Sequence, residues 1–305
     1  MHLEVKRQMG RGDIAAVSEL LEVAAKADDH HPLGEHQWLD LVEGRREGFA
    51  GLVAWEPGHD HPVGYAQVTK GTGSWALEFV VDPHHRLPDN TIGMELVGAA
   101  LGVVASEGGG HVHLWVSKPR PEHDAIAAAC GLNRGRELYQ MRRPLPVGER
   151  SDLPVRAFEP GRDEESWLAV NNRAFASHPE QGGWDVATIK AREKEPWFEP
   201  AGFLLHERDG RLAGFCWTKV HDDHDPALGE IYVIAVDPDF QHEHLGRQLV
   251  LAGLDSLAGR GITVGMLYVD AANVPAVKLY VDLGFTVDHV DRAYVTDVPS
   301  ARPTP

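Results

Sequence analysis

The segment in which chemistry is most readily expected is an apolar strand followed by a short loop and a helix. The strand 231–236 ends in Asp237-Pro238, and the polar loop 241–247 leads into a helical stretch that begins near Leu245. The N-terminus of a helix carries unpaired backbone N–H groups and the positive end of the helix dipole. This arrangement predicts a binding site for a phosphate or pyrophosphate group.

Histidines are frequent, with 18 in the chain, and two groups of them raise the question of a metal site. His221 and His224 flank two aspartates, and His242 is separated from His244 by one residue. Neither pair has the i, i+4 spacing of helical metal ligands, and neither has a cysteine beside it. We interpret both groups as solvated loop histidines and expect no metal. His242 and His244 remain of interest because they lie in the phosphate loop.

The elements that would position this loop occur twice in the chain. Asp82-Pro83 and Asp237-Pro238 each end an apolar strand, and they lie 155 positions apart. Gly131 and Gly284 each end a short helix and precede a hydrophobic residue, and they lie 153 positions apart. An offset held so steadily over several elements indicates two copies of one fold.

Periodic apolar patterns predict, in each half, helices, then antiparallel strands, then a helix–strand–helix–strand ending. This order predicts an α/β fold with a mixed sheet in each half. The Pro- and Gly-bearing stretch 144–154 reads as a linker, so the predicted domains are 1–145 and 153–298, and the tail 299–305 is expected to be disordered. The predicted helices are 13–26, one from 35, 92–107, 163–176, 186–194 and 245–260, and the predicted strands are 49–55, 63–70, 75–81, 113–116, 202–207, 212–220, 229–236 and 265–269.

Composition narrows the possible partners. The 46 acidic and 29 basic residues give a net charge of −17, which disfavours binding to nucleic acid. No apolar run approaches the roughly 20 residues of a membrane helix, and the N-terminus has no signal-peptide pattern. With only two cysteines, a disulfide framework is not expected. We expect a cytoplasmic monomer that acts on a small molecule.

The phosphate loop and the segment after it resemble the GCN5-related N-acetyltransferase (GNAT) family. Gln241 and Gly246 match the coenzyme A loop of that family, whereas His244 stands where its first glycine is expected. The final helix and strand of the family are matched by Asn273, Ala276, Leu279, Tyr280, Gly284 and Phe285. Taken singly, Asn273 could be a helix cap, Tyr280 a core aromatic residue and Gly284 a helix end. Their order and spacing together favour the acetyltransferase interpretation.

Within that family, the chain resembles the mycothiol synthases. The matching stretches are 171–184, 215–221 and 228–233, with 32–35 and 140–145 in the first half, and the match is densest over 155–296. The resemblance implies two tandem GNAT domains, each a mixed, mostly antiparallel sheet flanked by helices. It also implies an acetyl-CoA-dependent transferase that acetylates the cysteinyl amine of a cysteine–glucosamine–inositol conjugate, the last step of mycothiol synthesis.

The resemblance assigns roles to single residues. Glu230 matches the general base that a protonated amine requires before it can attack a thioester, and Tyr280 matches the acid that protonates the leaving thiolate. Substrate contacts fall on Glu35, Glu180, Lys219, Glu230 and Tyr268, although Glu35 and Glu180 could be plain loop carboxylates. The coenzyme contacts are Ile234, Ala235 and Val236 for the pantetheine arm, Gln241, His242, Glu243, His244, Leu245, Gly246 and Arg247 for the pyrophosphate, and Asn273, Val274, Pro275, Ala276, Val277 and Lys278 along the remaining channel.

The first copy has the sequence pattern of the fold but lacks the residues expected for catalysis. Pro88 and Asp89 stand where a phosphate would lie, and no tyrosine matches Tyr280 before Gly131. We expect this half to be non-catalytic, with a structural role and with Glu35 contributed to the substrate cleft. A second acetyl-CoA would contact Phe79, Val80, Val81, Asn90, Thr91, Ile92 and Gly93.

Two other functions fit the same residues. Another small-molecule amine acetyltransferase, for example one acting on an aminoglycoside, would share the fold and the coenzyme loop. A non-enzymatic acyl-CoA sensor would account for the altered loop at His244, but it would not need both Glu230 and Tyr280. A dinucleotide-binding domain is disfavoured because no Gly-x-Gly-x-x-Gly follows the first strand.

Overall fold

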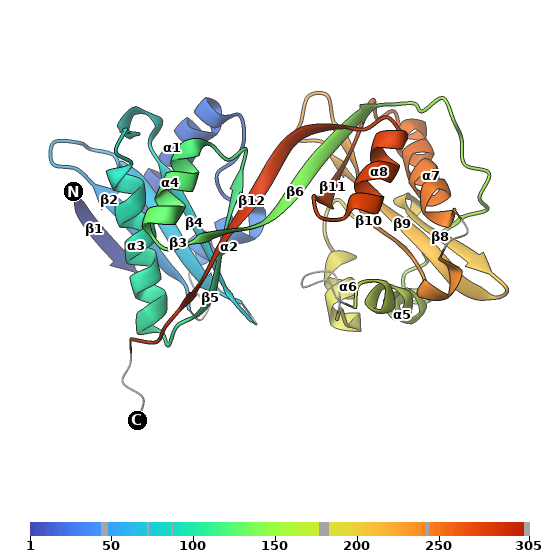
Figure 1. Cartoon of the computed structure of the whole chain (residues 1–305), viewed down its shortest axis with the longest axis horizontal. Helices are drawn as coiled ribbons and strands as arrows, with labels where there is room; N and C mark the ends of the chain where they lie inside the picture. Colours follow the sequence, from blue (N-terminus) through green and yellow to red (C-terminus); the bar gives the residue numbers. More distant parts are fainter. Residues whose placement is uncertain (44–47, 72, 87, 177–182, 242–243, 302–305) are drawn as a thin grey trace. The chain divides into compact units, whose positions relative to one another are not determined.

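The computed structural model describes residues 1–43, 48–71, 73–86, 88–176, 183–241 and 244–301, without the side chains of Glu35, His36 and Glu43 (Figure 1). The chain forms two compact units. Unit 1 consists of Met1–Glu137 with Val290–Pro305, and unit 2 consists of Leu138–His289. No helix among the described residues has the length and apolar character needed to cross a membrane.

In unit 1, six strands form a sheet in the order β1 (His2–Lys6), β2 (Ala50–Trp55), β3 (Gly64–Lys70), β4 (Trp75–Val81), β5 (Gly110–Ser117) and β12 (Thr286–Val298). The β4–β5 pair is parallel and the other pairs are antiparallel. Alternate strand residues face two cores, because successive side chains point to opposite faces. Leu52 packs with α3 (Thr91–Ser106) and α4 (Pro121–Ala129), whereas Val53 packs with α1 (Arg11–Asp28) and α2 (Glu35–Glu43).

In unit 2, the strand order is β6 (Asn133–Pro144), β11 (Val264–Asp270), β10 (Leu228–Val236), β9 (Arg211–His221), β8 (Phe203–Arg208) and β7 (Arg156–Ala157). The β10–β11 pair is parallel, and the other pairs are antiparallel. One face of the sheet packs on α7 (Leu245–Gly259) and α8 (Val274–Asp282). The other face packs on α5 (Glu164–Ala174) and α6 (Val186–Arg192) through an aromatic core around Trp167 and Trp217 (Figure 1).

Most of the last strand of each repeat lies in the unit of the other repeat. β6 follows α4 of the first repeat, yet it pairs with β11 over Leu138–Pro144. β12 follows α8 of the second repeat, yet it pairs with β5 over Asp291–Val298. The exchange was not predicted from the sequence, and the boundaries 1–145 and 153–298 remain a prediction for the sequence repeats.

The Asp-Pro dipeptides have the same structural role in both copies. Asp82 accepts a hydrogen bond from the backbone N–H of His84 at 2.8 Å, and Asp237 accepts one from Asp239 at 2.9 Å. Each aspartate thereby caps a single 3₁₀ turn that starts at the proline, η1 (Pro83–His85) and η3 (Pro238–Phe240). A proline fits the first position of such a turn because its φ is already restricted and its missing N–H needs no partner.

All the predicted helices and strands are present, with ends shifted by a few residues. The sequence analysis missed β1 and the two-residue strand β7, and it did not define β6 or β12. A short turn, η2 (Pro200–Gly202), precedes β8. Of the predicted disordered tail, residues 302–305 lie outside the described residues.

Candidate active site

Strand β10 separates from β11 halfway along its length. The paired positions of these parallel strands run from Leu228 to Ile231, whereas β10 continues to Val236. The register between β10 and β9 shifts between Ile231 and Val233, so that Tyr232 is a bulge residue. A bulge bends its strand and increases the local twist. Within the described part of unit 2, the backbone of Ile234, Ala235 and Val236 therefore lies beyond the pairing with β11, as a pantetheine-binding edge requires.

Helix α7 begins beside this opening, with His244 as its N-cap residue. His244 precedes the helix with φ 59°, a left-handed conformation that a glycine adopts without steric strain. The His244 side chain makes no capping hydrogen bond. A Cβ built on Gly246 would have Leu279 as its nearest neighbour, at 4.0 Å, so protein packing does not require glycine there. Leu245 is buried, Gln241 ends the η3 turn, and His242 and Glu243 lie outside the described residues.

Three of the predicted coenzyme residues already have protein partners. Arg247 forms an ion pair with Glu149 at 2.6 Å, so a pyrophosphate would compete with that carboxylate for the guanidinium group. Asn273 caps α8 by accepting a hydrogen bond from the backbone N–H of Ala276 at 3.3 Å, which confirms the capping interpretation. Lys278 pairs with Asp282 on the exposed side of α8, one helical turn away.

Glu230 is buried and is held by a histidine. Its carboxylate lies 2.7 Å from Nε2 of His221, the last residue of the neighbouring strand β9. A proton on Nε2 would make the ring a donor to the carboxylate. Lys219 lies directly opposite Glu230 in the β9–β10 register, and His221 is two residues further on the same face. The two strands thus bring a carboxylate, an imidazole and an ammonium group together.

Lys219 is oriented by aromatic rings. Its Nζ atom lies 4.6 Å from the ring centre of Trp197 and 5.9 Å from that of Tyr232. Such cation–π contacts hold the long side chain in place while leaving its N–H groups able to donate to hydroxyls.

Tyr268 lies on the same face of the sheet and is linked to β6. Its hydroxyl accepts a hydrogen bond from Gln140 at 2.7 Å, and the Gln140 carbonyl oxygen accepts one from Arg142 at 2.7 Å. Tyr268 and Gln140 face each other in the β6–β11 register. The exchanged strand therefore supplies polar groups next to a predicted substrate residue.

Tyr280 projects from α8 into the core that covers the other side of the sheet. Its ring packs edge-on against Phe285 at 5.9 Å, so Tyr280 is a core aromatic residue, and its role as an acid stays a prediction. Burial raises the pKa of the Tyr280 hydroxyl to about 12, with a smaller contribution from Cys216. The hydroxyl is therefore protonated at neutral pH, as an acid that donates a proton must be.

Unit 2 thus groups Lys219, Glu230 and Tyr268 on one face. The side chain of Glu35 is not described, and Glu180 lies outside the described residues. Sequence reasoning had placed His221 in a solvated loop, and it had assigned no role to Gln140 or Arg142. The sequence pattern could have indicated them. His221 is two positions from Lys219 on one strand, and Arg142 is two positions from Gln140 on another, and residues at this spacing share one face of a sheet.

In the corresponding region of unit 1, an acidic side chain lies at the start of the helix. The paired positions of β4 and β5 end at Leu77, so Phe79, Val80 and Val81 also lie beyond the pairing. However, the Asp89 carboxylate accepts a hydrogen bond from the backbone N–H of Thr91 at 3.2 Å, at the start of α3. Ile92 of α3 is buried, as Leu245 of α7 is. Gly93 lies 153 positions before Gly246, the same offset that separates Gly131 from Gly284. A Cβ on Gly93 would lie 2.6 Å from Ile126 of α4.

Known proteins resemble the chain at both the sequence and the structural level. A model of the acetyltransferase (GNAT) family matches residues 165–285. A Thermobispora bispora protein named mycothiol acetyltransferase is 44% identical over 302 residues, which cover 96% of this chain and 99% of that protein. A GCN5-related N-acetyltransferase from Sphaerobacter thermophilus is similar in structure, with a TM-score of 0.74 at 18% identity over 99% of this chain and 98% of that one. A tandem GNAT protein from the clavulanic acid biosynthesis pathway gives 0.67 at 18% identity, covering both chains fully. The solved structures establish the fold.

Proposed function

The chain belongs to the mycothiol acetyltransferase family of tandem GNAT enzymes, and from this premise we propose its substrate and its catalytic residues. The acceptor is the cysteinyl amine of a cysteine–glucosamine–inositol conjugate, and the donor is acetyl-CoA. The product is mycothiol, so the reaction is the last step of that synthesis.

The observation that carries the proposal is the opening between β10 and β11 beside the start of α7. The edge at 234–236 can pair with the amide groups of a pantetheine arm as an added strand would. The open space at Gly246 lets a pyrophosphate approach the N–H groups at the helix start. Both features come from the C-terminal repeat, and both lie in unit 2.

Glu230 and Tyr280 have suitable protonation chemistry for acetyl transfer. Acetyl-CoA supplies a thioester carbonyl that a neutral amine can attack. The Glu230 carboxylate takes a proton from the substrate ammonium group, directly or through water, and the free amine forms a bond to the carbonyl carbon. The carbon–sulfur bond breaks, and the Tyr280 hydroxyl gives its proton to the departing thiolate. His221 stabilises the carboxylate through their hydrogen bond and orients it toward the amine.

The first copy serves the fold and does not turn over the coenzyme. Its helix start is occupied by the Asp89 carboxylate. An additional negative charge at a helix N-terminus opposes binding of a pyrophosphate. A second acetyl-CoA would have to displace this carboxylate.

The cellular role can be tested by deleting the gene in its native host. The thiol extract of the deletion strain should contain the unacetylated cysteinyl conjugate and lack mycothiol, and a plasmid copy should reverse both changes. A plasmid copy carrying Glu230→Gln should not. A deletion strain with unchanged mycothiol and no accumulated conjugate would remove the assignment.

A further inference from the structure

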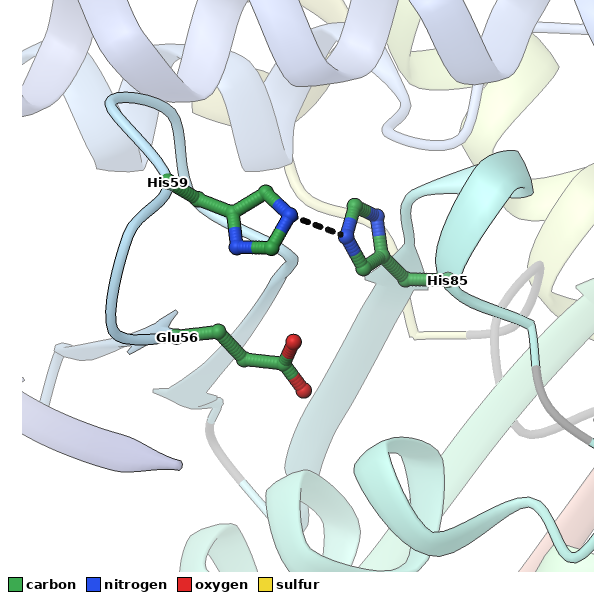
Figure 2. Close-up of side chains that lie close together, drawn as sticks. All are labelled: Glu56, His59 and His85. Carbon is green, nitrogen blue, oxygen red and sulfur yellow. Dashed lines mark hydrogen bonds between the residues drawn. The ribbon is translucent and has the colours of Figure 1, made fainter.

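Three histidines and two carboxylates from separate turns meet in unit 1. Glu56, His59 and His61 lie in the connection between β2 and β3, and Asp82 and His85 lie at the end of β4 and in η1. Figure 2 shows the rings of His59 and His85 facing each other, with the Glu56 carboxylate extending toward them. The donor atoms of Glu56, His59 and His85 all lie within 4.8 Å of one another.

The distance between the two imidazoles matches that of two ligands on one metal ion. Nε2 of His59 lies 3.2 Å from Nε2 of His85. Two nitrogens bound at 2.0–2.1 Å to a tetrahedral zinc ion lie about 3.3–3.4 Å apart. A small outward movement of the exposed His59 would place an ion between the rings, and the Glu56 carboxylate would be the third ligand.

The surroundings of His85 supply what a metal-binding histidine needs on its other nitrogen. Among the described residues, Nδ1 of His85 is buried without a hydrogen-bond partner, and the Asp82 carboxylate lies 3.7 Å away. Asp82 is itself buried and fixed by the backbone N–H of His84. A carboxylate behind a ligating histidine fixes the ring orientation and makes the metal-binding nitrogen more basic.

The charges and the donor types favour a transition metal over magnesium or calcium. Two neutral imidazoles with one carboxylate suit zinc and neighbouring first-row ions, whereas magnesium and calcium prefer oxygen ligands alone. The charge of a divalent cation would be balanced by Glu56 together with Asp82.

We propose that Glu56, His59 and His85 bind one divalent transition-metal ion such as Zn²⁺, with Asp82 as the carboxylate behind His85. The ion would tie the β2–β3 connection to η1 and so fix the segment that leads to α3. Nothing in the sequence indicated this site, because His59 and His85 are 26 positions apart, and the histidines from which no metal was expected are close neighbours in the sequence.

The test uses the full-length chain without an affinity tag, stripped with a chelator. Zn²⁺ is titrated in competition with a chromophoric chelator, and Co²⁺ is added separately to record the visible bands of tetrahedral cobalt. The wild type should bind one Zn²⁺ tightly and show those bands. His59→Ala and His85→Ala should lose the site and the bands, and Asp82→Asn should weaken binding by about 10–100-fold.

The matched control is His111→Ala, which removes a histidine of the same unit that pairs with Asp297 at 2.8 Å and lies outside the ligand set. It should bind Zn²⁺ as the wild type does. Metal-free melting temperatures should agree among the wild type and the His59, His85 and His111 variants, which excludes misfolding. Absence of a tight site in the wild type, or equal binding by the His59, His85 and His111 variants, would overturn the proposal.

Discussion

At the scale of single residues, the hydrogen bond between His221 and Glu230 can be tested. The test must show whether His221 orients the Glu230 carboxylate or only fills space beside it. We predict that His221→Ala lowers kcat by about 10-fold or more, because the carboxylate loses the hydrogen-bond partner that orients it. The KM for acetyl-CoA should change little. His221→Asn, whose amide can still donate a hydrogen bond, should restore part of the rate. An equal kcat loss in both variants, or a rise of the KM for acetyl-CoA in place of a fall of kcat, would leave His221 as a packing residue only.

Glu78 in unit 1 is another buried carboxyl group, and it bears on stability. Burial raises its pKa to about 8, partly offset by a hydrogen bond from Gln37. The native state keeps this proton up to about pH 8, whereas the unfolded chain releases it near the ordinary glutamate pKa of 4.5. The native state therefore binds more protons between these values, and this group makes the free energy of unfolding fall as pH rises through that window.

We accordingly predict that Glu78→Gln stabilises the chain at pH 8, by on the order of a few kcal/mol, and has little effect near pH 4.5. Glutamine keeps the shape and cannot ionise. Denaturant unfolding of both proteins at the two pH values would measure the difference. A stability difference that is equal at both pH values would show that the carboxyl group of Glu78 does not titrate in this window.

At the scale of elements, the start of α7 is the feature that distinguishes the two copies. We predict that Gly246→Ala weakens acetyl-CoA binding by about 10-fold or more, because a methyl group would occupy the space next to the helix N–H groups. The folded chain should tolerate the change, since the nearest of the described atoms to the new Cβ belongs to Leu279, at 4.0 Å. Gly259→Ala, at the other end of α7 and also without a clash, is the matched control.

Calorimetry with acetyl-CoA should find the Gly259 variant equal to the wild type. The melting temperature of the Gly246 variant should equal or exceed that of the wild type, because alanine favours the helix. Equal coenzyme affinities in the Gly246 and Gly259 variants would show that the coenzyme does not approach α7 at this point.

Most helices and strands could be predicted from the sequence, whereas the pairing between strands could not. The Asp-Pro turns and the helices after them follow from local rules of capping and periodicity. The bulge at Tyr232 could not be predicted in this way. An extra residue in a strand changes which face of the sheet the following side chains point to, but it does not change the composition of the strand. The contact of His221 with Glu230 depends on the β9–β10 register, which the turn between the strands sets.

At the scale of the whole molecule, the compact units and the sequence repeats are not identical. Tyr294 of β12 is buried in the core of unit 1, although it follows all the other elements of the second repeat. Met141 of β6 is likewise buried in unit 2. An apolar alternating strand fits any sheet edge of matching pattern, so the sequence predicts the strand and leaves its partner open. Residues 138–289 contain all the described residues that we assign to catalysis.

The central claim is that this chain acetylates the cysteinyl amine with Glu230 as the base. The most direct measurement incubates purified protein with acetyl-CoA and the cysteine–glucosamine–inositol conjugate at neutral pH, with an aminoglycoside as the competing acceptor. Mass spectrometry should follow the products, since the acceptor's own thiol would obscure a thiol assay. The account predicts N-acetylation of the conjugate alone, and a rate about 10²–10⁴-fold lower for Glu230→Gln. Faster acetylation of the aminoglycoside than of the conjugate, or an unchanged rate for Glu230→Gln, would contradict it.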